Sequence, residues 1–478
     1  MYFKQFYLGC LAHASYLIGS QGAGAVVDPQ RDVDHYLAEA RDAGLTIRYV
    51  IETHLHADFV SGHRELAERT GAEILISGRA GATFAHRALR DGDEIELGTL
   101  RLQVLETPGH TPEGICLLAA DRAQPGAAPK LFSGDTLFVG DVGRPDLAGS
   151  KGFTSREMAA MLYDSLHEKL LRLPDRVEVY PAHGAGSLCG RNISQDTMST
   201  LGVQRLTNYA LQPMSKEAFI AMMTDALPET PAYFAFDVEA NRSGAPPLEA
   251  LERPAAMSPA ELRRAQGSGT LVLDVRPYES YGPHHVPRSL NVGLDGQFAS
   301  WAGTLVPFER PLAIVAEDEA AVDQAVMRLA RVGCSNASGY LAGGIAAWER
   351  AGLGLAATAQ IDVDELAARL ARRTPMQLLD VRRPREFESG SAPGARSLPL
   401  ASLEAHLDEL DPSAPTVVVC GSGYRSSIAT SLLESAGFSD LTNVEGGIAA
   451  YVQRGHPLQT PAPAGATGAD RTSEAIAP

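Results

Sequence analysis

The chain has 478 residues, more than one compact domain usually contains, and this length predicts two to four domains. Hydrophobic residues make up 45% and charged residues 21% of the chain, which excludes a mainly disordered chain, a coiled coil and a collagen-like fibre. The net charge of −17 makes nucleic acid and anionic membrane surfaces poor partners. We therefore expect any anionic substrate to be captured by a local cationic or backbone site.

The five cysteines are odd in number and lie far apart in the sequence, at Cys10, Cys116, Cys189, Cys334 and Cys420. They form no CxxC pair and predict no disulfide framework, which indicates a reducing compartment. The N-terminal segment contains polar and charged residues throughout, without the apolar stretch of a signal peptide, and no run approaches the length of a transmembrane helix. We expect a cytoplasmic protein without membrane attachment.

Short apolar runs in the first half of the chain each end in a loop rich in potential metal ligands. The runs cover residues 47–51, 102–105, 131–132 and 177–180, and amphipathic segments at 64–69 and 156–171 lie between them. Strands that alternate with helices predict a layered α/β domain with its chemistry on loops at strand ends. The candidate ligands on these loops are His54, His56, Asp58, His110, Asp135 and His183. A lone histidine is more often structural, but four loops that deliver imidazole and carboxylate predict a site for zinc, iron or manganese.

The motifs THLHADFVSGH, TPGHTPEG, FSGDTLF and YPAHG resemble those of the metallo-β-lactamase superfamily, over roughly residues 1–240. The resemblance implies an αββα sandwich. Hydrolases of this superfamily such as glyoxalase II carry a histidine directly after the motif aspartate and use it to hold a second metal. Phe59 occupies that position here, and a phenyl ring is not a ligand, so a two-zinc thioester hydrolase is the less favoured alternative.

Within the superfamily the sequence is similar to the persulfide dioxygenases, and the segment GDVGRPD at residues 140–146 adds to this similarity. The resemblance implies one Fe(II) per chain, held by His54, His110 and Asp135. Two histidines and one carboxylate on one face of iron leave open positions for O₂ and a sulfur substrate. The other candidate ligands would orient ligands or water around the metal. They are His56, Asp58 and His183.

Two further side chains are candidates for roles near the metal. Arg144 is a candidate contact for a neighbouring group or a substrate carboxylate, and a loop salt bridge is an equally good interpretation. Cys189 lies in a glycine-rich segment after His183, a position from which a thiol would accept or relay sulfur. Free cysteines are more often small buried hydrophobes, so a structural role is the alternative.

Two segments in the second half of the chain repeat one another. LDVRP at residues 273–277 recurs as LDVRRP at 379–384, and GGIAAW at 343–348 recurs as GGIAAY at 446–451. An offset of about one hundred residues indicates duplication of a whole domain. Residues 241–247 have the composition of a linker, and the segment after Leu458 has that of a disordered tail. We expect a domain over residues 1–245, two related domains over 256–355 and 358–458, and a tail over 459–478.

The second repeat has a cysteine directly after an apolar strand. The six-residue loop Cys420–Arg425 precedes a helical pattern over residues 426–434, and backbone N–H groups and the helix dipole there stabilise anions. The same field favours the nucleophilic thiolate. Cys420 and Arg425 are the predicted catalytic residues of this loop, and Gly421, Ser422, Gly423 and Tyr424 are its predicted substrate-binding residues. A C-x₅-R phosphatase is a related alternative, although four residues, not five, separate the cysteine from the arginine.

This repeat resembles a rhodanese, a sulfurtransferase domain, over about residues 358–458, through LLDVRRPREFESGSAPGARSLPL, CGSGYR and NVEGGIAAYVQRGHPL. The resemblance implies an α/β domain with a parallel central sheet, in which Cys420 carries a persulfide and Arg425 binds the anionic donor or acceptor. In the first repeat, matching of glycines places Ala316 at the cysteine position, and the loop that follows has no arginine and three carboxylates. We interpret the first repeat as an inactive rhodanese copy.

An oxygen-activating iron site and a persulfide carrier in one chain predict an enzyme that oxidises the persulfide of glutathione, or of another low-molecular-weight thiol, with O₂. The products would be sulfite and the free thiol, and sulfite would collect a sulfur from Cys420 and leave as thiosulfate. The order of the two steps stays open, as does the carrier thiol. Two alternatives are a glyoxalase II-like hydrolase fused to a sulfurtransferase and a non-enzymatic sulfur-relay scaffold. The resemblance also implies assembly into a homo-oligomer.

Overall fold

The computed structural model describes residues 1–149, 152–225, 227 and 230–460. The chain forms two compact units. The first contains Met1–Ala255, Asp295–Leu312 and Glu319–Gly339, and the second contains Ala256–Leu294, Ala313–Asp318 and the chain from Tyr340 onward. Most of the predicted tail, residues 461–478, lies outside the described residues. At its predicted start, Gln459 pairs with Ser391 in an isolated β-bridge.

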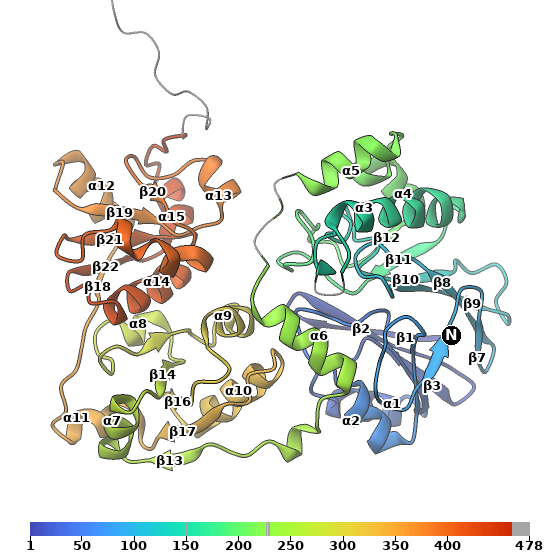
Figure 1. Ribbon diagram of the computed structural model, residues 1–478, viewed down its shortest axis with the longest axis horizontal. Coiled ribbons are helices and arrows are strands. Elements are labelled where there is room, and N and C mark those ends of the chain that lie inside the picture. The colour runs from blue at the N-terminus through green and yellow to red at the C-terminus, as the bar shows by residue number, and fades with distance from the viewer. Residues whose placement is uncertain (150–151, 226, 228–229, 461–478) are drawn as a thin grey trace, which may run out of the picture. The chain divides into compact units, whose positions relative to one another are not determined.

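Two six-stranded sheets form the first part of the chain (Figure 1). The first has the order β1-β2-β3-β4-β5-β6, with bounds Tyr2–Leu8, His13–Ser20, Ala23–Val27, Thr46–Ile51, Glu73–Ser77 and Arg87–Leu89. The second has the order β12-β11-β10-β9-β8-β7. Its strands are β7 Glu94–Leu97, β8 Leu100–Glu106, β9 Ile115–Asp121, β10 Lys130–Gly134, β11 Glu178–Pro181 and β12 Ser199–Thr200. Because β10 and β11 run parallel, the loops after them leave the sheet at the same edge.

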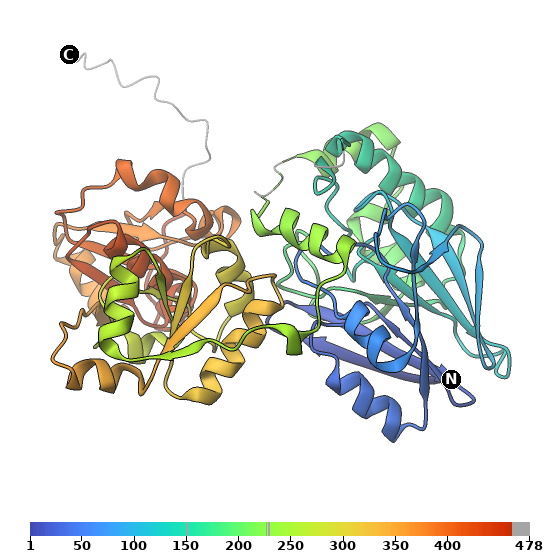
Figure 2. The same cartoon turned by 60° about the horizontal axis from the view of Figure 1, so that its bottom comes forward.

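The sheets pack face to face, and helices cover their outer faces (Figure 2). Apolar side chains from both sheets fill the layer between them, among them Tyr16, Leu102, Leu117 and Phe132. Helices α1 (Asp34–Asp42) and α2 (His63–Thr70) cover the first sheet. Helices α3 (Ser155–Tyr163), α4 (Leu201–Thr207) and α5 (Lys216–Thr224) cover the second. These four layers confirm the predicted αββα sandwich.

The first unit contains further helical segments. The predicted amphipathic segment 156–171 is α3 followed by a π turn, η2 (Asp164–Lys169), and a 3₁₀ turn, η3 (Leu170–Arg172). The others are η4 Tyr209–Leu211, α6 Tyr233–Ser243, η5 Leu248–Ala250, α9 Phe298–Leu305 and α10 Glu319–Ala330. The last two belong in sequence to the first repeat but pack in this unit.

The two repeats build five-stranded sheets with the same strand order. The first is β13-β17-β16-β14-β15 and the second is β18-β22-β21-β19-β20. The first has strands β13 Ala255–Met257, β14 Leu271–Asp274, β15 Leu290–Asn291, β16 Leu312–Val315 and β17 Ala337–Leu341, with helices α7 Pro259–Gly267, α8 Tyr278–Tyr281 and α11 Gly344–Arg350. The second has strands β18 Ala359–Ile361, β19 Gln377–Asp380, β20 Arg396–Ser397, β21 Thr416–Val419 and β22 Leu441–Val444. Its helices are α12 Val363–Ala371, α13 Pro384–Glu388, η6 Leu400–Glu409, α14 Tyr424–Ser435 and α15 Gly447–Gln453. The second sheet pairs in parallel throughout, and the shared order confirms duplication of an α/β domain.

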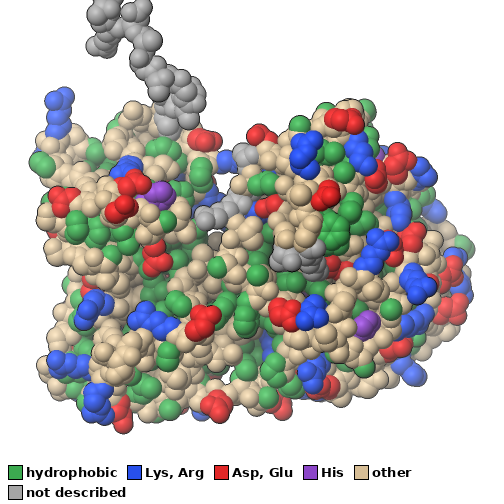
Figure 3. Space-filling view, viewed as in Figure 1, with side chains coloured by type: hydrophobic (Ala, Val, Ile, Leu, Met, Phe, Trp, Pro, Cys, Tyr) green, Lys and Arg blue, Asp and Glu red, His purple; other side chains and the backbone are tan. Residues whose placement is uncertain are grey.

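Charged side chains of both signs are interspersed on the face drawn in Figure 3. This mixture fits a chain with 41 cationic and 58 anionic residues. Among the described residues, no helix is both long and apolar enough to cross a lipid bilayer.

Candidate metal centre and cysteine loop

Three of the predicted ligands meet at the edge of the sandwich where their strands end. His54 follows β4, His110 follows β8 and Asp135 follows β10 directly. Their donor atoms lie within 4.8 Å of one another, and all three side chains are buried. Asp135 Oδ2 lies 3.7 Å from His54 Nε2 and 3.4 Å from His110 Nε2. These strands therefore bring two imidazoles and one carboxylate to a common point, a donor set that suits a borderline divalent metal.

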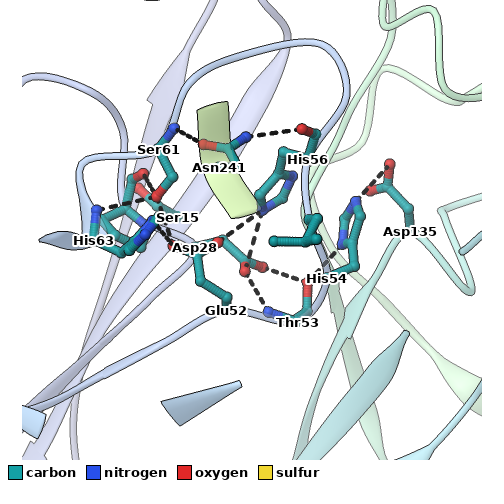
Figure 4. A network of polar contacts seen from close by, with 12 residues as sticks. Ser15, Asp28, Glu52, Thr53, His54, His56, Ser61, His63, Asp135 and Asn241 are labelled. Atoms are coloured by element: carbon teal, nitrogen blue, oxygen red, sulfur yellow. Dashed lines mark hydrogen bonds and ion pairs between the residues drawn. The ribbon is translucent and has the colours of Figure 1, made fainter. Parts of the chain in front are cut away.

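Hydrogen bonds fix the tautomers of both imidazoles. His110 Nδ1 lies 2.9 Å from the carbonyl of Arg144, which only accepts, so Nδ1 donates and Nε2 keeps its lone pair. Thr53 Oγ1 donates to Asp28 at 2.9 Å and therefore accepts from His54 Nδ1, also at 2.9 Å (Figure 4). Burial, with nearby His56, holds the pKa of His54 well below its ordinary value and keeps the ring neutral. Both Nε2 atoms therefore keep a lone pair that can bind a metal.

His183 lies between two carboxylates and holds one candidate ligand, Asp135, in place. Its Nδ1 is 2.8 Å from Asp135 Oδ1, and its Nε2 is 2.9 Å from Asp58 Oδ2. Burial lowers the pKa of His183, but Asp135 and Asp58 outweigh it and raise the pKa well above its ordinary value. Burial raises the pKa of Asp135, but His183 and His54 outweigh it and hold that pKa well below its ordinary value. The result is a charged pair of His183 and Asp135, in which His183 orients Asp135.

His56 faces away from this point, toward a second pair of carboxylates. Its Nε2 is 3.3 Å from Asp28 Oδ1 and 3.5 Å from Glu52 Oε2 (Figure 4). Burial lowers its pKa, but the two carboxylates raise it above the ordinary value overall. The donor atoms of His56, Asp58 and His183 also lie within 4.8 Å of one another, so a second candidate ligand group adjoins the first.

The phenyl ring of Phe59 borders this second group. Its centroid is 4.4 Å from that of His56 and 4.1 Å from that of His13. His13 is fully buried, and neither of its ring nitrogens has a hydrogen-bond partner among the described residues. Burial, with His183 and His56, holds its pKa well below the ordinary value, so the ring is neutral. Sequence reasoning did not find His13, because a single histidine in a strand carries no spacing signal.

Asn241 on α6 holds the loop that carries the histidine motif. Its Nδ2 donates to the carbonyls of His56 at 2.8 Å and Phe59 at 2.7 Å, and its Oδ1 accepts from the amide of Ser61 at 2.7 Å (Figure 4). The side chain is buried at 2% exposure, so these bonds are shielded from water. The sequence indicated a linker at 241–247, which is wrong at its first residues. Asn241–Ser243 complete α6, because this face of the helix binds the loop.

Arg144 contributes its main chain to the site, while its side chain is engaged elsewhere. The side chain is 1% exposed, and its Nε donates to Asp146 Oδ1 at 2.7 Å. Its carbonyl accepts from His110, and its amide donates to the carbonyl of Cys189 at 3.0 Å. The loop salt bridge considered from the sequence is therefore formed, and the guanidinium faces Asp146.

Cys189 lies beside the metal candidates. Its sulfur is within 4.8 Å of donor atoms of Asp135 and His183. The side chain is 1% exposed. Burial, with the charges of Asp58 and Asp135, raises the pKa of its thiol well above the ordinary value. The position is near the centre, but the environment opposes thiolate formation.

Cys420 stands at the end of β21 with its sulfur among donors. The amide of Gly423 lies 3.1 Å from Sγ, and Ser426 Oγ lies 3.3 Å from it. The helix begins at Tyr424 instead of Ser426, so the predicted six-residue loop is shorter. The reason is Gly423, whose left-handed φ of 105° turns the chain directly into the helix and lets it serve as the N-cap. Arg425 therefore lies in the first turn of α14.

The residues around Cys420 are fixed by their own contacts. Arg425 donates from both terminal nitrogens to Glu386, each at 2.7 Å, in a bidentate pair. Gly421 and Ser422 connect the cysteine to this turn, and Tyr424 donates from its hydroxyl to the carbonyl of Gly293 at 2.8 Å. A Cβ at Gly447 would lie 2.3 Å from the Cys420 carbonyl, so glycine is required where the GGI turn meets the loop.

The first repeat also contributes to the neighbourhood of this loop. A Cβ at Gly423 would lie 3.0 Å from the Tyr278 ring, so that ring lies against the loop. Burial, with Glu279 and more weakly Cys420, raises the pKa of Tyr278 above its ordinary value. Sequence reasoning missed Tyr278 because the contact joins residues far apart in the chain.

Known proteins resemble each part of the chain. Residues 8–183 match the metallo-beta-lactamase superfamily, and residues 258–351 and 362–454 each match the rhodanese-like domain. The mitochondrial persulfide dioxygenase ETHE1 of Bos taurus is 30% identical over 231 residues, which are 48% of this chain and 82% of that protein. A hydroxyacylglutathione hydrolase of Polaromonas sp. is 37% identical over 174 residues, which are 35% of this chain and 61% of that protein.

A solved structure extends the similarity beyond the first domain. The crystal structure of a metallo-beta-lactamase from Staphylococcus aureus subsp. aureus COL covers 71% of this chain and 98% of that chain, at 34% identity and a TM-score of 0.63. Together with the rhodanese-like matches, the persulfide dioxygenase relatives support an enzyme of sulfur metabolism that acts on persulfides and other sulfur compounds.

Proposed function

The chain belongs to the metallo-β-lactamase superfamily and continues into two rhodanese-like domains, and from this premise we propose that it is a persulfide dioxygenase with sulfurtransferase activity. The proposed substrate is the persulfide of glutathione or another low-molecular-weight thiol. The overall oxidation consumes one persulfide, O₂ and water, and yields the thiol, sulfite and two protons. The observation that carries the proposal is the buried His54, His110 and Asp135 set in the same chain as the Cys420 loop.

The donor set fits a mononuclear Fe(II) centre. His54 and His110 present Nε2 and Asp135 presents Oδ2, and His54 Nε2 has no hydrogen-bond partner among the described residues. When bound by these three residues, Fe(II) supplies the activation of O₂. The chain itself orients the set: Thr53 and the Arg144 carbonyl fix the imidazoles, and His183 fixes the carboxylate.

The proposed sulfur transfer uses the anion-binding character of the cysteine loop. In the loaded state, Cys420 carries the outer sulfur of a persulfide next to the Gly423 amide. Sulfite attacks that sulfur, the S–S bond breaks with its electron pair returning to Cys420, and thiosulfate leaves. Arg425, held by Glu386, supplies the cation that a charged donor or acceptor needs in this acidic chain. Covalent fusion raises the effective concentration of the shared intermediate.

A glyoxalase II-like thioester hydrolase is the second candidate, and two observations favour it. The chain has hydroxyacylglutathione hydrolases among its relatives, and the His56, Asp58 and His183 group adjoins the first donor set. Phe59 weighs against it, because it places an apolar ring beside that group. A hydrolase with two metals needs that group to bind a second ion.

Paired substrates separate the two candidates. The anaerobically purified chain is given glutathione persulfide, with O₂ uptake measured, and S-lactoylglutathione, with thioester loss measured. The proposal expects O₂ uptake without thioester hydrolysis, and Asp135→Ala should abolish that uptake while Cys420→Ser should not. Thioester hydrolysis without O₂ uptake would replace the dioxygenase by a hydrolase.

A further inference from the structure

The inactive first repeat touches the histidine-motif loop of the metal site. The compact unit that holds the metal candidates also contains residues 319–339, which comprise α10 and the turn after it. In that turn the carbonyl of Arg331 accepts from the amide of Val60 at 2.7 Å. Val60 follows Phe59 on the motif loop, six residues after His54. A segment that is far away in sequence thus closes a backbone hydrogen bond of the metal-binding loop.

The side chain of Arg331 makes a second attachment beside the first. Its Nε and Nη2 donate to Asp32 Oδ1 and Oδ2, each at 2.8 Å, and the Arg331 side chain is 12% exposed. The segment after β3, which leads to Asp32, also contacts the motif loop. The carbonyl of Pro29 accepts from Ser61 Oγ at 3.0 Å and from the Gly62 amide at 3.3 Å. One arginine therefore holds two adjacent segments through its carbonyl and its side chain.

The loop is held from two directions. Asn241 on α6 binds the His56 and Phe59 carbonyls and the Ser61 amide, and Arg331 binds the amide of Val60 between them. α6 and the turn also touch one another, because a Cβ at Gly333 would lie 2.6 Å from Asp237 Oδ1. The φ of Gly333 is +70°, which also favours glycine. Glycine at position 333 therefore allows the turn to lie close to α6.

Among the described residues, the second repeat shows no counterpart to this attachment. Matching Gly333 with Gly437 places Ser435 opposite Arg331. Ser435 ends α14 and its short side chain donates to the Arg288 carbonyl at 3.4 Å. The catalytic copy therefore has a serine where the inactive copy has the bidentate arginine, and the docking is specific to the inactive copy.

We propose that the inactive repeat is a positioning element of the metal centre, with Arg331 as the residue through which it acts. It holds the loop between His54 and Gly62 so that His54 keeps its place beside His110 and Asp135. Arg331 touches neither substrate nor metal, so its effect passes through the loop. The inference rests on the metal site of the proposed function, but its geometry does not depend on the reaction.

The test compares two arginine variants of the full chain. Arg331→Ala removes the bidentate pair with Asp32. Arg253→Ala is the matched control, because Arg253 forms an exposed pair with Asp323 on the same α10, at 3.1 Å and about 60% exposure on each side. Two readouts are independent of turnover: the rate at which a chromogenic chelator strips Fe(II) from the protein, and hydrogen–deuterium exchange of the peptide that contains Val60.

Arg331→Ala should release Fe(II) about tenfold faster and exchange the Val60 peptide faster, while Arg253→Ala behaves like the parent. Arg331→Lys should recover part of the effect, because it keeps the charge but not the fork. A lower melting temperature with unchanged Fe(II) release and unchanged exchange would overturn the inference. If the parent chain binds no Fe(II), the proposed function fails, and exchange at Val60 alone then decides the positioning role.

Discussion

The two rhodanese-like copies share a scaffold and differ at the loop that begins with Ala316 in the first copy and with Cys420 in the second. Each copy buries an Asp–Arg pair at the end of the strand beside its central strand, β14 or β19: Arg276 Nε donates to Asp274 at 2.9 Å, and Arg382 Nε donates to Asp380 at 3.0 Å. In each copy, a glycine of the GG turn also lies against the carbonyl of the residue directly after the central strand, β16 or β21. That residue is Ala316 in one copy and Cys420 in the other.

The loops diverge immediately after that strand. The second copy has Cys420 and, in the first helical turn, Arg425. The first copy has Ala316 followed by exposed Glu317, Asp318 and Glu319, and α10 begins at Glu319. Since the scaffolds match, the fold is kept when the loop sequence changes, and we expect the capacity to bind anions to follow the loop.

The largest expected effect comes from the cysteine. Cys420→Ser should lower thiosulfate:sulfurtransferase activity by at least about 1,000-fold, because the hydroxyl forms no persulfide. Persulfide-dependent O₂ uptake should persist. Thiocyanate formation from thiosulfate and cyanide measures the first activity, and an oxygen electrode measures the second. The reciprocal variant Ala316→Cys should gain no sulfurtransferase activity, since its loop has three carboxylates and Ala321 stands where the other copy has Arg425. A gain of activity would contradict this expectation.

Because the two copies share a scaffold, loss of the buried Asp–Arg pair should lower the free energy of unfolding equally in both. Arg382→Met and Arg276→Met each leave a buried aspartate without its bidentate partner, which costs about 3–5 kcal/mol. Denaturant unfolding followed by fluorescence and by peptide-level exchange would report each copy. A large cost in one copy and none in the other would show that the pairs are not equivalent.

A third prediction concerns the charge of Arg425, which the first copy lacks at the matching position. Arg425→Gln removes a charge-assisted contact for the anionic donor, and kcat/KM for thiosulfate should fall by about 10- to 100-fold. Glu386→Gln keeps the cation but loosens its bidentate anchor, so a smaller drop of about threefold is expected. Steady-state kinetics on both variants provide the measurement. An equal decrease in kcat/KM in both variants would show that activity with thiosulfate depends on the ion pair between Arg425 and Glu386, and not on the Arg425 charge by itself.

The smallest effect concerns Asp237, which lies against the turn of the first copy. Its oxygens have no hydrogen-bond partner among the described residues, and burial, with repulsion from Asp58, raises its pKa well above the ordinary value. The folded state therefore binds more protons than the unfolded state, and stability falls as pH rises from about 4 toward the folded pKa.

Asp237→Asn removes the ionisable group and therefore the decrease in stability at high pH. It should stabilise the chain by about 1–2 kcal/mol at pH 8 and by little near pH 4. Unfolding curves at the two pH values measure the difference. Glu239→Gln, an exposed change on the same helix, is the control and should show no gain at pH 8. Stabilisation by Asp237→Asn that is equal at both pH values would contradict the charge argument.

Motif spacing and internal repetition predicted what depends on local pattern. The loops after β4, β8 and β10 bring His54, His110 and Asp135 together because strand ends meet at one edge of a sandwich. Comparison of the repeats located the position of Ala316 opposite Cys420 without any knowledge of the fold. The roles of these residues stay predictions.

The contacts that sequence reasoning missed join distant segments and have no spacing signal. Asn241 lies 185 residues after His56, whose carbonyl it binds, and Arg331 lies 299 residues after Asp32. A single asparagine in a helix or a single arginine in a turn carries no signal in the sequence. Only packing of α6 and of the α10 turn on the motif loop makes these residues important, and packing of that kind cannot be read from periodicity.

The central claim is a mononuclear iron centre that oxidises a persulfide. It is tested most directly by metal analysis of the anaerobically purified chain together with O₂ consumption on addition of glutathione persulfide. We expect about one iron per chain and O₂ uptake that depends on the persulfide. Two zinc ions per chain with no O₂ uptake would contradict it and would leave only the sulfur chemistry of Cys420.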